Sequence, residues 1–115
     1  MAGDTIFHKI MDGEIPSTKL HDDEYCFAIK DIEPASPVHI LVIPKKTIPK
    51  LAEASKDDKQ LLGHMLLVIK DLAEQEGIAE DGYRVVINSG ENASQSVFQL
   101  HMHLLGGRSF SWPPG

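Results

Sequence analysis

The chain has 115 residues, 42% of them hydrophobic, which is enough for one compact domain over residues 1–115 with an apolar core. Its 11 basic and 17 acidic residues give a net charge of −6, which argues against a nucleic-acid backbone or an anionic membrane as a partner. The single cysteine, Cys26, excludes an internal disulfide, and with no signal peptide or apolar run of membrane-spanning length this predicts a cytoplasmic protein.

The first half of the chain predicts a helix followed by three strands. Asp4 is predicted to cap a helix over residues 5–11. Residues 19–21 and 25–30 predict two strands joined by an acidic turn, as in a β-hairpin. Residues 38–43 are almost wholly apolar, which is typical of a central strand covered on both faces.

The second half predicts helices and then two more strands. A short helix is expected over residues 48–54, and a long amphipathic helix is expected between the N-cap residue Ser55 and Gly77. Residues 83–88 and 97–105 predict the last two strands, separated by a loop of small residues. This order leaves few crossovers between parallel strands, so we expect an α+β domain with a mainly antiparallel sheet.

The last predicted strand has one apolar and one polar face, because alternate side chains of a strand point to opposite sides. The face expected in the core carries Phe98, Leu100, Met102 and Leu104. The opposite face carries Val97, Gln99, His101 and His103. Burying three polar side chains without partners is costly, so this face predicts a hydrogen-bonded network, a solvated surface or a functional site.

His101 and His103 permit two chemistries, and their spacing alone leaves both open. With His39 from the predicted central strand they could form a zinc site of three histidines. One imidazole could instead act as a nucleophile while its neighbour binds or protonates the substrate. His39 could also be a core histidine that is hydrogen-bonded to the backbone. The remaining histidines, His8, His21 and His64, are predicted to lie on the surface.

Common phosphate-binding motifs are missing from the sequence, which has neither a P-loop nor the glycine-rich turn of a dinucleotide-binding fold. A phosphate would therefore have to be bound by side chains and by the backbone N–H groups of one segment, arranged as an anion nest. The segment expected to form this nest is Ser94, Gln95, Ser96 and Val97.

Residues 96–105 (SVFQLHMHLL) resemble the histidine triad signature, in which three histidines alternate with apolar residues, with Gln99 at the place of the first histidine. The segments PVHILVIPKK (37–46), YRVVIN (83–88) and GGRSFSWPPG (106–115) resemble the same family. The chain is thereby identified as a member of the histidine triad (HIT) family. Its small size and its Trp-Pro-Pro-Gly end resemble the Hint branch of purine nucleoside phosphoramidases.

The resemblance implies a five-stranded antiparallel sheet with two main helices, paired in a homodimer whose sheets are continuous. It also implies a hydrolase that needs no metal or other cofactor. Such an enzyme binds purine nucleoside monophosphates and cleaves the P–N bond of adenosine phosphoramidates, including compounds like aminoacyl-AMP. The alternatives are a dinucleoside polyphosphate hydrolase, a non-enzymatic AMP-binding regulatory module and a metal protein with three histidine ligands.

The resemblance assigns a role to each matching residue. His101 corresponds to the nucleophile that forms a covalent nucleotidyl-histidine, and His103 corresponds to the histidine that contacts the phosphate and the leaving group. His39 would support this pair, and Ser96 would hydrogen-bond the phosphate or the departing amine. The expected nucleotide-binding residues are Phe7, Ile10 and Ile32 at the base, Asp31 at the ribose, Asn88 near phosphate and ribose, Ser94, Gln95, Val97 and Gln99 around the phosphate, and Trp112 in a tail that reaches the partner's site.

Two departures from the family pattern matter. Gln99 cannot titrate, but its backbone carbonyl remains, and the resemblance implies that this carbonyl orients the nucleophile. We therefore expect activity to be kept with an altered pH profile. Ala93 and Ser94 stand where relatives often carry glycine, so we expect a reshaped phosphate loop.

Overall fold

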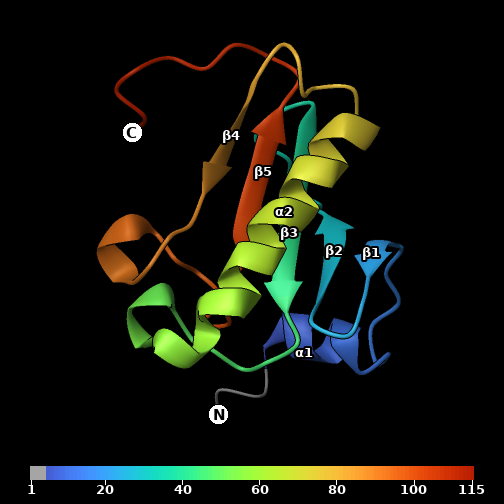
Figure 1. Cartoon of the computed structure of the whole chain (residues 1–115), viewed down its shortest axis with the longest axis vertical. Coiled ribbons are helices and arrows are strands. Elements are labelled where there is room, and N and C mark those ends of the chain that lie inside the picture. The colour runs from blue at the N-terminus through green and yellow to red at the C-terminus, as the bar shows by residue number, and fades with distance from the viewer. Residues whose placement is uncertain (1–4) are drawn as a thin grey trace.

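The structure is a computed structural model that describes residues 5–115, and its five strands form one antiparallel sheet in the order β1-β2-β3-β5-β4 (Figure 1). This confirms the predicted α+β class. Within residues 5–115 no helix has both the length and the apolar character needed to cross a bilayer. The elements in chain order are α1 (Ile6–Met11), β1 (Lys19–Asp22), β2 (Cys26–Lys30), β3 (Val38–Pro44), the short 3-10 helices η1 (Leu51–Glu53) and η2 (Lys56–Asp58), α2 (Lys59–Gln75), β4 (Tyr83–Val86), η3 (Glu91–Ala93) and β5 (Met102–Gly106).

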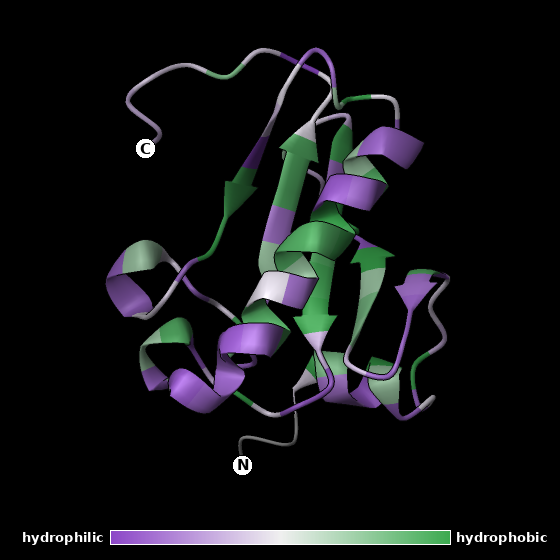
Figure 2. Cartoon of the chain, viewed as in Figure 1, coloured by the Kyte–Doolittle hydropathy of each residue, from purple (hydrophilic) through white to green (hydrophobic). Residues whose placement is uncertain are grey.

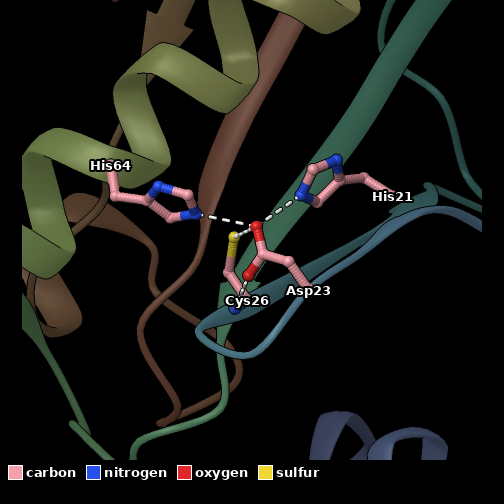
Figure 3. Close-up of side chains that lie close together, drawn as sticks. All are labelled: His21, Asp23, Cys26 and His64. Atoms are coloured by element: carbon pink, nitrogen blue, oxygen red, sulfur yellow. Dashed lines mark hydrogen bonds and ion pairs between the residues drawn. The ribbon is translucent and has the colours of Figure 1, made fainter.

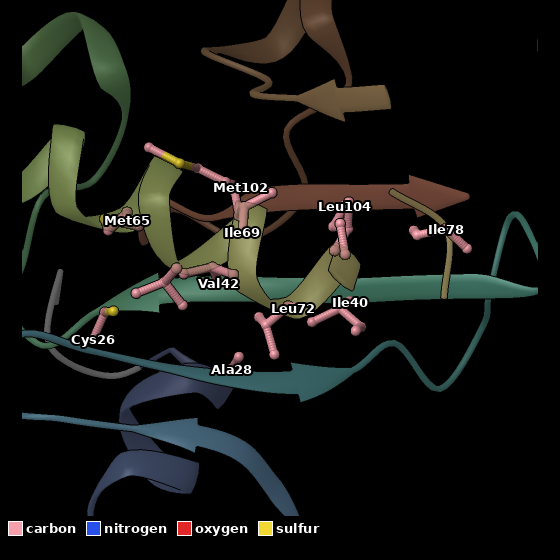
Figure 4. Close-up of a cluster of buried hydrophobic side chains, with 12 residues drawn as sticks. Cys26, Ala28, Ile40, Val42, Met65, Ile69, Leu72, Ile78, Met102 and Leu104 are labelled. Atoms are coloured by element: carbon pink, nitrogen blue, oxygen red, sulfur yellow. The ribbon is translucent and has the colours of Figure 1, made fainter. Parts of the chain in front are cut away.

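Alternation along the strands produces two cores, one on each face of the sheet. The α2 face is the one that α2 crosses (Figure 1), and there Met65, Ile69 and Leu72 of the helix pack on the sheet (Figure 4). Its sheet residues include Ala28, Ile40, Val42, Met102 and Leu104. The opposite face, called the α1 face, packs Phe7 and Ile10 of α1 against Phe27, Ile29, Leu41 and Ile43.

The third strand is the centre of the sheet, as its apolar sequence predicts. β3 pairs with β2 on one side and with β5 on the other, and its residues after Val38 are buried. Figure 2 shows hydrophobic residues in β2, β3, β4 and β5 and along part of α2. Because β3 is covered on both faces, any polar side chain on it must find a partner inside the protein.

The helix starts are capped as the sequence indicates, with small shifts. Asp4 lies outside the described residues, and Thr5 is the observed N-cap of α1, in a reciprocal capping box with His8. Ser55 forms the same kind of box with Asp58, at the start of η2, which runs directly into α2. The helix predicted over residues 48–54 is reduced to the single turn η1.

The last predicted strand is partly wrong, because residues 97–101 are not in the sheet and β5 begins only at Met102. The N–H of Leu100 donates to the carbonyl of Ile48 at 2.7 Å, so it does not pair within the sheet. The predicted alternation of core and exposed side chains fails for the residues before Leu100. Phe98, predicted in the core, is 43% exposed, whereas Leu100, Met102 and Leu104 are buried as expected. Likewise β4 ends at Val86, two residues earlier than predicted.

Candidate active site

A cavity of about 310 Å³ opens on the α1 face, between α1, the chain after β2 and the segment that leads into β5. Eight of the predicted site residues line it: Phe7, Ile10, Asp31, Ile32, Ser96, Val97, His101 and His103. Other lining residues that the sequence interpretation missed include Ile29 and Leu41. The sequence held a signal for both residues. Leu41 lies two positions from His39 on the same side of β3, and Ile29 lies two positions from Asp31, which follows β2.

His101 lies in this cavity with its proton in a defined position. Its Nδ1 is 2.8 Å from the backbone carbonyl oxygen of Gln99, and a carbonyl can only accept, so Nδ1 carries the hydrogen. Nε2 of the neutral ring therefore holds a lone pair. The ring of Phe7 packs edge-on against the imidazole, with 4.9 Å between the ring centroids, and fixes its plane. His101 is thus a neutral imidazole with a lone pair available for attack.

His39 and His103 form a relay whose protons can be assigned in the same way. The N–H of Ala35 donates to His39 Nδ1 at 3.0 Å, so the proton of His39 is on Nε2. That Nε2 lies 2.9 Å from His103 Nδ1, which must accept, so His103 carries its proton on Nε2. His103 Nε2 is the one buried side-chain polar atom without a partner among the described residues. The relay therefore ends in an unsatisfied N–H donor on a residue that lines the cavity.

Burial favours the uncharged form of all three imidazoles. It lowers the pKa of His39, although the nearby charge of Asp31 opposes the shift. Burial also lowers the pKa of His101 against the opposing hydrogen bond to Gln99. For His103, burial and the neighbouring histidines lower the pKa to about 4. Asp31 Oδ2 lies 3.4 Å from His39 Nε2, so one carboxylate borders the relay and the cavity.

In the structure, fewer residues are available to form the predicted anion nest than the sequence indicated. The N–H groups of Ser94 and Gln95 donate to the carbonyls of Glu91 and Gly90, so they are not free for a phosphate. Gln95 is buried, and its side chain braces the loop through Gly90, Pro49 and Val97. Of the four predicted nest residues, Ser96 and Val97 line the cavity. Ser94 has a φ of 65°, the left-handed conformation that a glycine would adopt freely.

The side chain of Gln99 has a structural role. Its Oε1 accepts the N–H of Ile48 at 3.0 Å, and its Nε2 donates to the carbonyls of Pro44 and Lys46 at 3.0 and 2.9 Å. At 1% exposure it fastens the chain after β3 to the segment before β5. Only its backbone carbonyl reaches the site residues, through His101.

Two further predicted site residues, Asn88 and Trp112, lie outside the cavity of this chain, and the prediction that His8 is a surface residue is wrong. Trp112 is 81% exposed and lies near Arg84, on the C-terminal segment at the other end of the sheet from α1 (Figure 1). His8 is not a surface residue: it is 5% exposed, and its Nε2 lies 3.0 Å from the hydroxyl of Thr47. The bond crosses 39 positions of sequence, so local pattern could not reveal it.

Two groups of metal-ligating side chains come together within residues 5–115, and neither is the predicted set of three histidines. One contains Asp31, His39 and His103, without His101. The N–H of Ala35 donates to His39 Nδ1, so His39 Nε2 keeps its hydrogen and donates it to His103 Nδ1, which leaves no lone pair on His39 for a metal. The geometry therefore fits a proton relay better than a zinc site. The other group contains His21, Asp23, Cys26 and His64.

Comparison with known proteins places this arrangement in a family. Residues 12–110 match the HIT domain. An uncharacterized HIT-like protein of Synechocystis sp. is 53% identical over 115 residues, the whole of both chains, and the 14 kDa zinc-binding protein of Zea mays is 52% identical over 113 residues, 96% of this chain and 88% of that protein. The crystal structure of a HIT family hydrolase from Legionella pneumophila superposes with a TM-score of 0.94 at 45% identity, covering 97% of this chain and 100% of the other. The chain belongs to the HIT family.

Proposed function

We propose that this HIT protein hydrolyses the P–N bond of purine nucleoside phosphoramidates through a covalent intermediate on His101. The observation that carries the proposal is the hydrogen bond from His101 Nδ1 to the Gln99 carbonyl, which leaves the Nε2 lone pair for attack on phosphorus. Nε2 forms a bond to phosphorus while the P–N bond breaks, and the amine leaves with a proton taken from solvent water. Water then cleaves the phosphorus–Nε2 bond and releases the nucleoside monophosphate.

The unpaired N–H of His103 supports this chemistry, because a phosphoryl oxygen would satisfy it. A donor already held in place stabilises negative charge as it develops in the transition state. In the same proposal Ser96 hydrogen-bonds the phosphate or the departing amine, and Asp31 accepts from the ribose hydroxyls. Phe7, Ile10 and Ile32 form the slot for the base, which fits their places in the lining of the cavity.

Two other functions use the same cavity. A dinucleoside polyphosphate hydrolase would share the nucleophile and differ in the leaving group. A regulatory module would bind AMP without turnover, and then the lone pair of His101 would have no chemical use. We favour the phosphoramidase because residues 106–115 (GGRSFSWPPG) resemble the Hint branch.

The Zea mays relative is named for zinc binding, which makes a metal-dependent reaction a specific alternative. In this chain the candidate ligands beside the cavity are Asp31, His39 and His103. A metal there would displace the proton that links His39 to His103. We propose instead that the reaction needs no metal, since the relay presents a neutral N–H donor without one.

We also propose a homodimer in which Trp112 serves the partner's cavity. The support is its position: the side chain is 81% exposed and does not line the cavity of its own chain. Analytical ultracentrifugation tests the assembly, and Trp112→Ala should raise KM for bulky amine leaving groups. A monomer with full activity would contradict this part of the proposal.

The test of the function is steady-state hydrolysis of an adenosine phosphoramidate and of a diadenosine polyphosphate, each with and without a metal chelator. The wild-type protein should cleave the phosphoramidate faster, without effect of the chelator, and His101→Ala should lose turnover while still binding AMP in calorimetry. Preferred cleavage of the polyphosphate would favour the second hydrolase. AMP binding without turnover would favour the regulatory module, and loss of activity with the chelator would favour a metal enzyme.

A further inference from the structure

A second cluster of chemically active side chains lies on the α2 face, where the β1–β2 hairpin meets α2 (Figure 3). His21 comes from β1, Asp23 from the turn of the hairpin, Cys26 from the first position of β2 and His64 from α2. The site proposed for hydrolysis uses the α1 face, so the sheet separates the two. No step of the proposed hydrolysis involves any of these four residues.

All four side chains converge on one point. Asp23 Oδ1 accepts the backbone N–H groups of Tyr25 and Cys26 at 2.7 and 2.9 Å, which fixes the carboxylate. Its other oxygen, Oδ2, lies 2.6 Å from His21 Nε2, 2.7 Å from His64 Nε2 and 3.9 Å from the sulfur of Cys26 (Figure 3). One ligand atom from each residue lies within 4.8 Å of every other.

The four side chains of the cluster differ in burial, in an arrangement that would let an ion enter from solvent. Cys26 is fully buried and forms the floor, whereas the side chains of His21, Asp23 and His64 are 32%, 26% and 37% exposed. Burial and the charge of Asp23 raise the pKa of the Cys26 thiol to about 12, so the free thiol is neutral at pH 7. Burial disfavours the charge of Asp23, but hydrogen bonds from His21, from the backbone and from His64 outweigh it and hold the pKa well below its usual range.

We propose that His21, Asp23, Cys26 and His64 form a structural zinc site, with one sulfur, two nitrogen and one oxygen ligand. Cysteine sulfur, histidine nitrogen and carboxylate oxygen are all zinc ligands, and four of them match the tetrahedral coordination of zinc sites closed to substrate. On binding, the thiol gives its proton to solvent and each neutral imidazole carries its proton on Nδ1, so that Nε2 can bind the metal. Two donor atoms bound to one tetrahedral zinc ion lie roughly 3.3 Å apart, so the two short nitrogen–oxygen contacts must lengthen by roughly 0.6 Å. The partly exposed side chains of His21, Asp23 and His64 can move this far.

The effect expected of the ion is to hold the hairpin to α2. Asp23 and His64 are 41 positions apart in the sequence, and the ion would add a direct link between two elements that already pack together in the core. Since the four ligands meet only in the folded chain, zinc should raise the Tm as its free concentration rises.

The test is a titration of tag-free, metal-free protein with Co²⁺, followed by absorption spectroscopy. Cys26 is the only cysteine of the chain, so any thiolate-to-cobalt charge-transfer band reports this residue alone. We expect the band to saturate at one equivalent and to disappear on adding one equivalent of Zn²⁺. His64→Gln should weaken binding at least about tenfold, because outer-shell changes alone cost that much.

The matched control is His39→Gln, which alters the other group of potential ligands and should leave the thiolate band and its affinity unchanged. Cys26→Ser should abolish the band, and circular dichroism would show whether that core variant folds. The proposal is overturned by the absence of the band, by a band whose affinity His21→Gln and His64→Gln both leave unchanged, or by binding that His39→Gln removes. None of these readouts depends on hydrolysis.

Discussion

His39 and His103 lie on the α1 face of the sheet, and His21 and His64 lie on the α2 face, yet their protons are held differently. On the α1 face a backbone N–H starts a relay that ends in a buried donor without a partner. On the α2 face both imidazoles point Nε2 at one carboxylate oxygen of Asp23. The comparison indicates that the chemical role open to a histidine depends on which ring nitrogen carries its proton and on what accepts that proton. A relay with an open end suits an anionic substrate, and a closed convergent cluster suits a cation.

The largest expected difference between the two faces is in catalysis. His103→Ala removes the open N–H donor and should lower kcat by about 10²–10³-fold, the usual cost of losing one donor to a developing oxyanion. His64→Ala, on the other face, should leave kcat for phosphoramidate hydrolysis within about twofold of wild type. Steady-state kinetics of the two variants, measured side by side, makes the comparison. Equal losses in both would contradict the separation of the two clusters.

A second large difference is expected in the free energy of unfolding, between variants of two adjacent residues next to the site. Gln99→Ala removes the side-chain partner of three backbone groups, two of them buried, on Pro44 and Ile48, and one partly buried, on Lys46. It should lower the free energy of unfolding by about 2–4 kcal/mol. Phe98→Ala changes an exposed side chain and should cost less than about 1 kcal/mol. Urea unfolding measures both, and a Gln99→Ala variant as stable as Phe98→Ala would refute the role assigned to the amide.

The α1-face relay also predicts how stability depends on pH. The pKa of His103 is about 4 in the folded chain, against an ordinary value of 6.5, so the unfolded chain binds more protons between these values. The stabilisation is complete above pH 6.5 and is lost as the pH falls toward 4. We expect a loss on the order of 1 kcal/mol between pH 7 and pH 5. His103→Gln should flatten this part of the urea-unfolding profile, and an unchanged slope in that variant would contradict the assignment.

The smallest expected effect is a change in stability on substitution in the loop around Ser94. Ser94 adopts the left-handed conformation that favours glycine, so Ser94→Gly should stabilise the protein by about 0.5 kcal/mol. Ala93→Gly, in the 3-10 turn beside it, lacks this relief and should be slightly destabilising. Thermal unfolding of the two variants gives the comparison, and the opposite order would show that the backbone of Ser94 is not strained.

The sequence predicted those features that depend on local periodicity. The apolar run of β3 identified the central strand, and the alternation at the end of the chain brought His101 and His103 to one cavity. It failed where a partner distant in sequence decides the structure. Gln99 is fastened to backbone groups 51 to 55 positions away, and these bonds take the preceding segment out of the sheet and leave Phe98 exposed.

The second cluster was missed for the same physical reason. His21 and His64 each have polar or charged neighbours, a pattern typical of surface residues. Only the packing of α2 on the sheet brings His64 to Asp23, across 41 positions. By contrast, Asp31 and Ile32, which line the cavity, were predicted through the family resemblance, which carries information about long-range contacts that periodicity lacks.

The central claim is that the lone pair of His101 attacks phosphorus. The most direct test mixes the protein with an adenosine phosphoramidate for a single turnover, quenches in alkali, and measures the intact mass and the peptide map. We expect one added nucleoside monophosphoryl group on the peptide that carries His101, and none in His101→Ala. Turnover that continues in His101→Ala, or an adduct on another residue, would contradict it.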